Sequence, residues 1–219
     1  MFRLFFTLIA FLFPLISVAE DSNSSLSIKY GVVQSQIQNT DSGNLSVLNQ
    51  KYELGYSYRL DDSVFATLNL NFSSYRQNSY TAGIRVMAND QMAFHLFGGG
   101  KEEVFNYYTF PDQTGPIVND QIFMPITGAD FSFNLPLNDR FSIGILTALI
   151  LYLPTGNDTY LFSLNAGTES SIFVKYQTNA HLSYQLNILY GNEQHNSSFF
   201  TQKQTDIGGG IGLNWDFNF

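Results

Sequence analysis

His181 and Ser183 are the first pair of side chains with catalytic potential, because they lie two positions apart and Glu193 follows them. A histidine that activates a serine, and is itself oriented by a carboxylate, performs nucleophilic catalysis. Residues two apart on a strand share a face, so His181 and Ser183 can meet. Glu193 would lie beyond the other end of that strand, since about ten residues at ~3.3 Å each separate them. We therefore expect no catalytic triad here.

Glu193 and His195 form a second acid–histidine pair, within the polar segment 191–204. The other two histidines, His95 and His181, are distant in sequence, whereas a metal centre needs several ligands held together. We expect a solvated loop at 191–204. We also expect no metal centre and no cofactor, and we predict that the chain is not an enzyme.

Apolar side chains recur at every second position through most of the chain, which is the pattern of β-strands. Between Tyr52 and Leu60 the even positions are apolar or aromatic, whereas the odd ones include Glu53 and Arg59. The segment 182–190 alternates in a similar way. These elements must position any functional side chain.

Short connections rich in Asp and Asn, such as LDDSVF (60–65) and NDRFSI (138–143), alternate with long irregular ones. Asp and Asn favour tight turns because their side chains bond nearby backbone groups. All tight turns are thus expected at one end of the molecule and all long loops at the other. Eight or twelve strands, and a partial loop near Pro125, remain alternatives to the main prediction. That prediction is ten strands, with cores at 25–33, 48–60, 63–73, 80–88, 91–99, 121–135, 140–153, 160–177, 180–190 and 205–219.

Ionised side chains are confined to one face of these predicted strands. The apolar rows contain no Lys, Arg, Asp or Glu, whereas a soluble sandwich would carry charge on its exterior. A strand-built structure that exposes its apolar face to lipid must close into a barrel to pair its backbone groups. We therefore predict an all-β fold, a transmembrane antiparallel up-and-down β-barrel. The residues predicted to line its lumen are Lys29, Lys51, Glu53, Arg59, Arg85, His95, Asp130, Glu169, Lys175 and Asp216, and the same rows hold Asp206 and His181.

The N-terminal segment and the composition of the chain agree with an exported barrel protein. Residues 1–19 combine Arg3, an apolar run and small residues before a cleavage site after Ala19, which predicts a secretory signal peptide. Residues 20–219 then form one barrel domain. The chain has no Cys, so it has no disulfide framework. With 10 basic and 18 acidic residues, net charge −8, it is a poor polyanion binder, and nucleic acid is not expected as a partner.

The last ten residues, GIGLNWDFNF, place Ile211, Leu213, Trp215, Phe217 and Phe219 on one face of the final predicted strand. This pattern resembles the final strand of bacterial outer-membrane β-barrel proteins, which the assembly machinery reads as an insertion signal. The resemblance implies a location in the outer membrane of a Gram-negative bacterium. It also implies outer-membrane lipid, lipopolysaccharide and the assembly machinery as partners. No individual family is indicated, and Phe217 stands where tyrosine is commoner.

Two features resemble enzymes of this class. His181 with Ser183 is similar to the His-x-Ser pair of outer-membrane lipid A deacylases. Glu193 with His195 is similar to an acid–histidine pair in the outer loops of the ten-stranded omptin proteases, but the second acidic pair of those enzymes has no clear counterpart. An outer-leaflet lipid or peptide hydrolase is therefore the third of three functional hypotheses.

The leading hypothesis is a non-enzymatic surface or structural barrel whose outer loops contact a partner. This hypothesis rests on the segment 100–120. Its sequence VFNYYTFP places four aromatic residues where an exposed loop is expected, namely Phe105, Tyr107, Tyr108 and Phe110. Exposed aromatics among polar residues often mark binding surfaces. The same aromatics would equally suit a loop folded over the barrel mouth.

The alternative hypothesis is a porin-like narrow channel for small solutes, lined by groups such as Arg85, Glu169 and Lys175. The same nearly balanced charges would also form a plug of ion pairs, because the interior of a small barrel is just wide enough for side chains. The inward row of 140–153 turns apolar toward the loop end, at Ile150 and Tyr152. We expect aromatic residues of the loops to pack against this apolar patch as a cap. The alternative is that the patch binds a hydrophobic solute.

Overall fold

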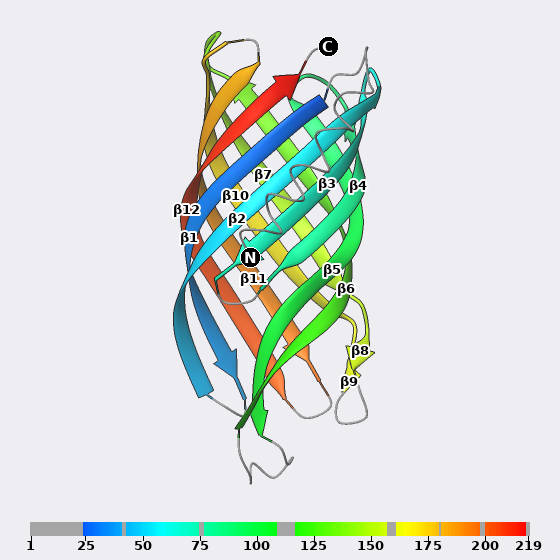
Figure 1. The fold of residues 1–219 in the computed structure, drawn as a ribbon, viewed down its shortest axis with the longest axis vertical. Helices are drawn as coiled ribbons and strands as arrows, with labels where there is room; N and C mark the ends of the chain where they lie inside the picture. Colours follow the sequence, from blue (N-terminus) through cyan, green and yellow to red (C-terminus); the bar gives the residue numbers. More distant parts are fainter. Residues whose placement is uncertain are drawn as a thin grey trace, which may run out of the picture.

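Ten long strands form a closed barrel in the computed structural model of the chain (Figure 1). Neighbouring strands are antiparallel, in the order β1-β12-β11-β10-β7-β6-β5-β4-β3-β2. The first strand pairs with the last, from Ser24 opposite Phe217 to Asn39 opposite Gln202, and this pairing closes the cylinder. The predicted all-β up-and-down barrel with ten strands is confirmed.

The structure describes residues 24–40, 43–74, 77–108, 117–156, 161–179, 181–197 and 200–217. The predicted signal peptide and Phe219 lie outside these residues. Two short strands, β8 (Thr155–Gly156) and β9 (Leu161–Phe162), pair with each other apart from the barrel. The barrel strands are β1 (Ser24–Asn39), β2 (Gly43–Asp61), β3 (Val64–Ser73), β4 (Ser79–Met87), β5 (Met92–Tyr108), β6 (Ile117–Pro136), β7 (Phe141–Tyr152), β10 (Asn165–Gln177), β11 (Leu182–Asn196) and β12 (Thr201–Phe217).

Several strands run further toward the loop end than the sequence predicted. β1 continues to Asn39 and β5 to Tyr108, and β6 runs unbroken through Pro125. In the extension of β1 the outward residues are polar, as exposed Gln34 shows, whereas inward residues such as Ile37 are buried. The backbone ladder therefore continues past the level where the outward apolar row ends. The sequence prediction missed these segments because it relied on that apolar row.

The exterior carries an apolar band. Leu96 and Ile188 are each 68% exposed and Leu186 is 62% exposed, as expected of side chains that face lipid. On β11, Tyr184 and Tyr190 flank Leu186 and Ile188, in the way that aromatic girdles flank the apolar band of membrane barrels. The predicted sorting of side chains, with apolar rows outward, is therefore present.

The final strand carries the same outward row. Ile211 and Trp215 are exposed on β12, and Leu213 lies between them on the same face. These are central residues of the predicted insertion signal, whose recognition by an assembly machinery remains a prediction. Among the described residues, no helix is long and apolar enough to cross a membrane.

A charge placed in the apolar band should destabilise the barrel. We expect Ile188→Arg to lower the free energy of unfolding in lipid vesicles by about 2–4 kcal/mol, the cost of a cation near the bilayer midplane. Asn192→Arg is the matched control, because Asn192 is an exposed residue of the same outward row beyond Tyr190. It should cost about 1 kcal/mol or less. Urea titration of both variants measures the difference, and equal losses would contradict a lipid-facing band.

Candidate functional site

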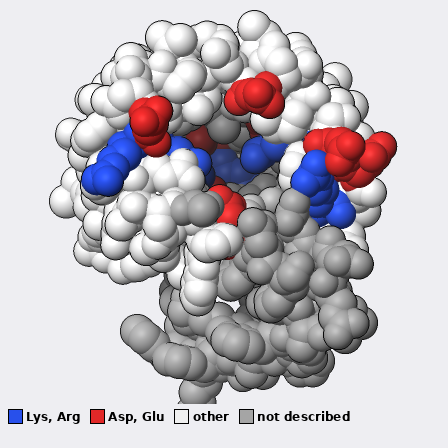
Figure 2. Space-filling model, turned by 90° about the horizontal axis from the view of Figure 1, so that it is seen from above, with Lys and Arg blue, Asp and Glu red and all other residues white. Residues whose placement is uncertain are grey.

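A cavity of about 470 Å³ occupies the barrel interior. It extends from Ser25 and Asn214 near the tight-turn end to Gln77 and Gln204 near the loop end, and we call it the chamber. Figure 2 looks onto the tight-turn end and shows a hollow there, with basic and acidic side chains around and within it. The charged and histidine residues that line the chamber are Lys29, Lys51, Glu53, Arg85, His95, Lys101, Asp130, Glu169, Glu193 and Asp206.

Most of the predicted lumen residues line the chamber, and ion pairs join several of them. Lys29 Nζ donates to Glu53 Oε1 at 2.6 Å, between neighbouring strands β1 and β2. Lys51 Nζ donates to Asp206 Oδ2 at 2.8 Å, from β2 to β12. The charged side chains of the lumen wall are thus partly joined in ion pairs and partly face open space.

Three predicted lumen residues, Arg59, Lys175 and Asp216, lie outside the lining of the chamber, and their place in the lumen stays a prediction. They lie close to the tight-turn ends of their strands, where side chains can reach turn residues. Arg59 pairs with Asp62 of the adjoining turn at 2.7 Å. Lys175 lines a separate, smaller hollow beside Arg140.

A hydrogen-bonded chain of three side chains lies on the chamber wall, and sequence reasoning did not connect its members. Thr67 Oγ1 lies 2.7 Å from His95 Nε2, and His95 Nδ1 lies 2.7 Å from Asp130 Oδ2. These three hydrogen-bonded side chains come from β3, β5 and β6 in that order. The exposed fraction is 8% for Thr67 and 3% for His95. The carboxylate of Asp130 accepts from Nδ1–H, so in the neutral ring Nε2 accepts from the Thr67 hydroxyl.

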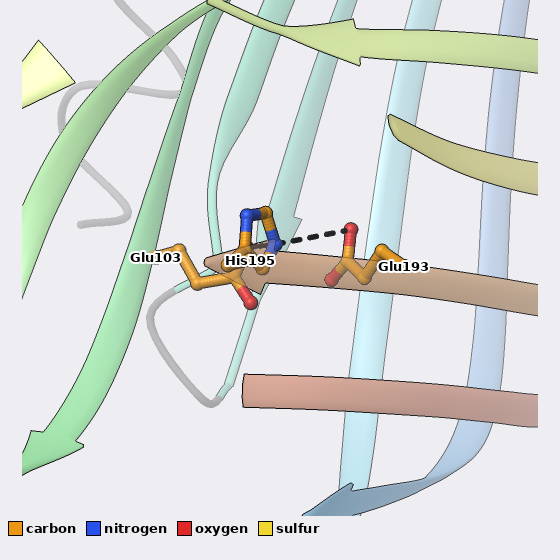
Figure 3. A group of neighbouring side chains, drawn as sticks. All are labelled: Glu103, Glu193 and His195. Atoms are coloured by element: carbon orange, nitrogen blue, oxygen red, sulfur yellow. Dashed lines mark ion pairs between the residues drawn. The ribbon is translucent and has the colours of Figure 1, made fainter. Parts of the chain in front are cut away.

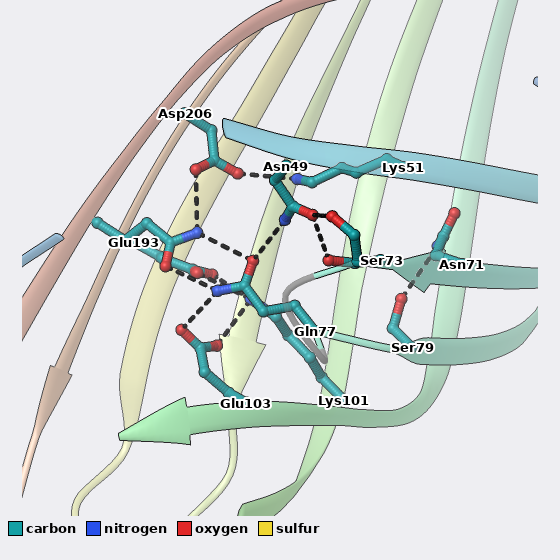
Figure 4. Close-up of polar contacts among 12 residues, drawn as sticks. Asn49, Lys51, Asn71, Ser73, Gln77, Ser79, Lys101, Glu103, Glu193 and Asp206 are labelled. Atoms are coloured by element: carbon teal, nitrogen blue, oxygen red, sulfur yellow. Dashed lines mark hydrogen bonds and ion pairs between the residues drawn. The ribbon is translucent and has the colours of Figure 1, made fainter. Parts of the chain in front are cut away.

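Gln77 bridges opposite walls of the barrel near the loop end (Figure 4). It lies between β3 and β4, and its side chain is buried. Its Nε2 donates to Gln204 Oε1 on β12 at 2.8 Å and to Glu103 Oε1 on β5 at 3.4 Å. Its Oε1 accepts from Asn49 Nδ2 on β2 at 3.5 Å. One loop side chain thus ties three strands of the barrel together.

An ion cluster lies beside this bridge, formed by Lys101, Glu103, Glu193 and His195, and Figure 3 shows its acidic and histidine members. Lys101 Nζ lies 2.9 Å from Glu103 Oε2 and 2.6 Å from Glu193 Oε2. His195 Nε2 lies 3.4 Å from Glu103 Oε2, and Tyr152 donates to Glu193. Glu103 and His195 are completely buried. The predicted solvated loop at Glu193 and His195 is therefore wrong, because β11 continues through both residues and turns them inward.

Electrostatics explains how these ionisable groups tolerate burial. The outward neighbours of Glu193 and His195 on β11 are polar, so this level lies beyond the apolar band. Burial by itself would lower the pKa of His195, but Glu103 and Glu193 outweigh it and raise that pKa to about 9. Burial would raise the pKa of Glu193, but Lys101 and His195 hold it well below its usual range. Two cationic groups thus face two carboxylates at neutral pH.

The ion cluster contains donor atoms that suit a metal ion, but its centre is occupied. One ligand atom from each of Glu103, Glu193 and His195 lies within 4.8 Å of the others. The ammonium of Lys101, however, contacts both carboxylates at ion-pair distance. A divalent ion would have to displace this cation or tolerate its repulsion. The geometry therefore favours an ammonium-centred network over a metal centre.

An aromatic cluster fills the loop end next to the ion cluster. Phe105 is wholly buried and packs against Phe162 and Phe200, with ring centroids 4.7 and 5.9 Å away. Tyr152 and Met124 belong to the same cluster. The expectation that aromatics cap the apolar end of 140–153 is confirmed. Together, Gln77, Gln204, the ion cluster and this aromatic cluster form what we call the loop-end seal.

The position of Phe105 corrects the predicted outer contact surface. Because β5 extends to Tyr108, Phe105 is an inward strand residue rather than part of an exposed loop. Tyr107 and Tyr108 are also strand residues by their backbone, and Phe110 lies outside the described residues. If the alternation that turns His95 inward had been continued along the sequence, it would have placed Lys101, Glu103 and Phe105 inside the barrel. No sequence signal indicated that Gln77 would enter it.

The predicted separation of His181 and Ser183 from Glu193 is borne out by their positions. His181 is exposed next to a tight turn, where its carbonyl oxygen accepts from Asp216 N at 2.7 Å. Glu193 lies at the other end of β11, in the ion cluster. These residues do not form a catalytic group.

Comparison with known proteins shows the fold. No family model and no curated protein sequence matches the chain. An outer-membrane channel from Pseudomonas putida F1 is similar in structure, with a TM-score of 0.51 and 9% identity over 90% of this chain and 96% of that chain. The NanC porin (TM-score 0.43, 13% identity, 87% and 98% covered) and the outer-membrane protease OmpT from Escherichia coli (0.43, 10%, 89% and 97%) are more distant. The chain has the fold of bacterial outer-membrane β-barrel proteins.

The raised pKa of His195 predicts that the barrel loses stability at alkaline pH. The folded state keeps a proton on His195 up to about pH 9, whereas an unfolded histidine loses it near 6.5. The stabilisation is therefore complete below about pH 6.5 and disappears as pH rises through about 9, with a slope approaching about 1.4 kcal/mol per pH unit between them. Urea unfolding across this range measures the slope. His195→Asn should flatten it and the exposed control His181→Asn should not, so equal slopes in the two variants would contradict the assignment.

Proposed function

We propose that this barrel is a narrow outer-membrane channel for small polar solutes, closed at the loop end in the conformation described here. The observation that carries the proposal is the chamber, a polar cavity of about 470 Å³ that leads from the tight-turn end to the loop-end seal. In barrels of this class the short turns face the periplasm. A solute in the periplasm would therefore reach the seal through the chamber.

The lining of the chamber suits polar solutes. Lys29, Lys51 and Arg85 supply positive charge, and Glu53 and Glu169 supply negative charge, on a wall that otherwise carries many Ser, Thr, Asn and Gln side chains. A barrel that served only as an anchor could fill the same space with packed side chains. The structural similarity to an outer-membrane channel supports this proposal as well.

The composition of the loop-end seal suggests a gate. Its bridge depends on Gln77, a side chain from a connection between strands rather than from the barrel wall. Moving this one connection would remove the link between β5 and β12 and leave the wall intact. Phe105, one of the four aromatic residues that supported a partner-contacting loop, is part of the seal. The channel therefore replaces the surface-contact role as the leading proposal.

A permanently plugged, non-conducting barrel is the second candidate. It is favoured by the complete burial of Glu103, Phe105 and His195, since breaking a buried ion pair is strongly unfavourable. The two candidates make opposite predictions about whether the wild-type barrel conducts ions.

Single-channel recording in planar lipid bilayers tests the proposal. We expect the wild-type barrel to stay closed most of the time and to show brief openings. Gln77→Ala should raise the open fraction several-fold, because it removes the bridge across the lumen. Glu169→Gln should shift the ion selectivity of the openings toward anions, since Glu169 lines the chamber.

Asn78→Ala is the matched control, because Asn78 is the adjacent amide and donates to Glu102 Oε2 on β5 at 3.1 Å instead of entering the seal. It should leave the open fraction unchanged. A wild-type barrel without openings at any voltage would reject the channel and leave the plugged barrel. If Glu169→Gln left the ion selectivity of the openings unchanged, the current would not pass through the chamber.

A further inference from the structure

We propose that Thr67, His95 and Asp130 form a catalytic site that hydrolyses small esters entering the chamber. The inference does not depend on conduction, because the three residues line the chamber on the side that opens at the tight turns. It departs from the sequence prediction that the chain is not an enzyme.

The geometry matches what nucleophilic catalysis requires. A hydroxyl lies 2.7 Å from the ring nitrogen of a histidine, and the other ring nitrogen lies 2.7 Å from a carboxylate. Both distances lie within hydrogen-bond reach, and the sequence of groups is nucleophile, base and orienting acid. Thr67 supplies the hydroxyl, His95 the base and Asp130 the acid.

The neighbouring residues hold His95 in this position. Thr67 and Gly83 are opposite each other on β3 and β4, so the imidazole from β5 has to pass over Gly83 to reach the hydroxyl. A Cβ at Gly83 would lie 2.6 Å from His95 Nε2, which is closer than real Cβ contacts. The ring of Phe97 lies 5.4 Å from the imidazole and limits its rotation. The missing side chain at Gly83 therefore leaves the space that the Thr67–His95 contact occupies.

Arg85 supplies a cationic donor beside the histidine. It is opposite His95 in the β4–β5 ladder and lines the same chamber. Its Nε is buried and has no hydrogen-bond partner among the described residues, and Asp130 Oδ1 is likewise unpartnered. A buried donor without a partner is costly. A ligand oxygen that accepts from Arg85 would satisfy it, and the oxyanion of an ester intermediate is such a group.

The reaction proceeds in two balanced steps. Thr67 Oγ1 attacks the ester carbonyl carbon and gives its proton to His95 Nε2, while Arg85 stabilises the oxyanion. The bond to the leaving alkoxide then breaks, His95 returns the proton to that oxygen, and an alcohol departs from the acylated Thr67. Water attacks the acyl carbon next, with His95 taking its proton. The bond to Thr67 breaks, the proton returns to Oγ1, and a carboxylic acid leaves.

The chamber selects the substrate class. A cavity of about 470 Å³ is within the size range of small-molecule sites. Its wall beside the three residues carries polar side chains such as Asn69 and Ser132, which suit a polar alcohol, and the apolar Phe97 and Leu146, which suit a short acyl group. A short-chain ester with a polar alcohol fits both the size and the polarity. Its entry would be from the tight-turn end.

Acyl transfer from p-nitrophenyl acetate to the detergent-refolded full-length barrel tests the proposal. We expect release of p-nitrophenolate together with an acetyl group on Thr67, detected by mass spectrometry of peptides after acid quenching. Thr67→Ala and His95→Asn should each lower the rate about 100-fold, the usual contribution of a positioned base. Thr67→Ser should retain activity, because it keeps the hydroxyl.

Thr147→Ala is the matched control. Thr147 is an exposed threonine on the outer face of β7, outside the lining of the chamber, where its hydroxyl lies 3.2 Å from Ser170 Oγ, so its loss should leave the rate unchanged. Wild-type protein without acetyl on Thr67 would overturn the proposal. So would Thr67→Ala protein that keeps the rate of Thr147→Ala protein, since His95 alone would then account for the turnover.

Discussion

Backbone hydrogen bonding in a lipid environment is the constraint on which the rest of this structure depends. No water is available in hydrocarbon, so every N–H and C=O of a strand has to find a partner in a neighbouring strand. The pairing of β1 with β12 meets this requirement by leaving no free edge in the barrel. Closure then divides the side chains into two populations, because successive residues of a strand point to opposite faces. Exposed Leu96 and Ile188 belong to one population, and buried His95 and Asp206 belong to the other.

Closure also creates an interior in which polar groups have to be paired or hydrated. In the chamber, ion pairs such as Lys29–Glu53 line a space large enough for solvent or a solute. In the loop-end seal, Glu103 and His195 are completely buried and each lies at ion-pair distance from an oppositely charged partner. The same inward rows thus line an open cavity in one part of the barrel and form a buried network in another. The difference arises where Gln77 and the aromatic cluster enter the lumen.

The two proposals use different parts of this interior. Conduction depends on the loop-end seal, whereas ester hydrolysis depends on the wall of the chamber at Thr67, His95 and Asp130. A closed seal would keep a substrate that enters at the tight turns from passing to the loop side, and an open seal would let its products leave in that direction. One fold can support many functions, so the barrel fold alone does not distinguish these roles. The side chains of the lumen decide between them.

The sequence by itself determined the sorting of side chains and therefore the barrel. Apolar residues at alternate positions, together with ionised residues confined to the other face, predicted the strand type and which rows face inward, whereas the strand count of ten still had eight and twelve as alternatives. It also placed Arg85, His95 and Asp130 in the lumen. Only the tertiary structure decided which inward residues meet, because contacts such as Thr67–His95 and Glu103–His195 join separate strands through register and barrel curvature. Strand pairing carried β5 and β11 past their apolar rows, and so Phe105 and His195 became part of a seal instead of exposed loops.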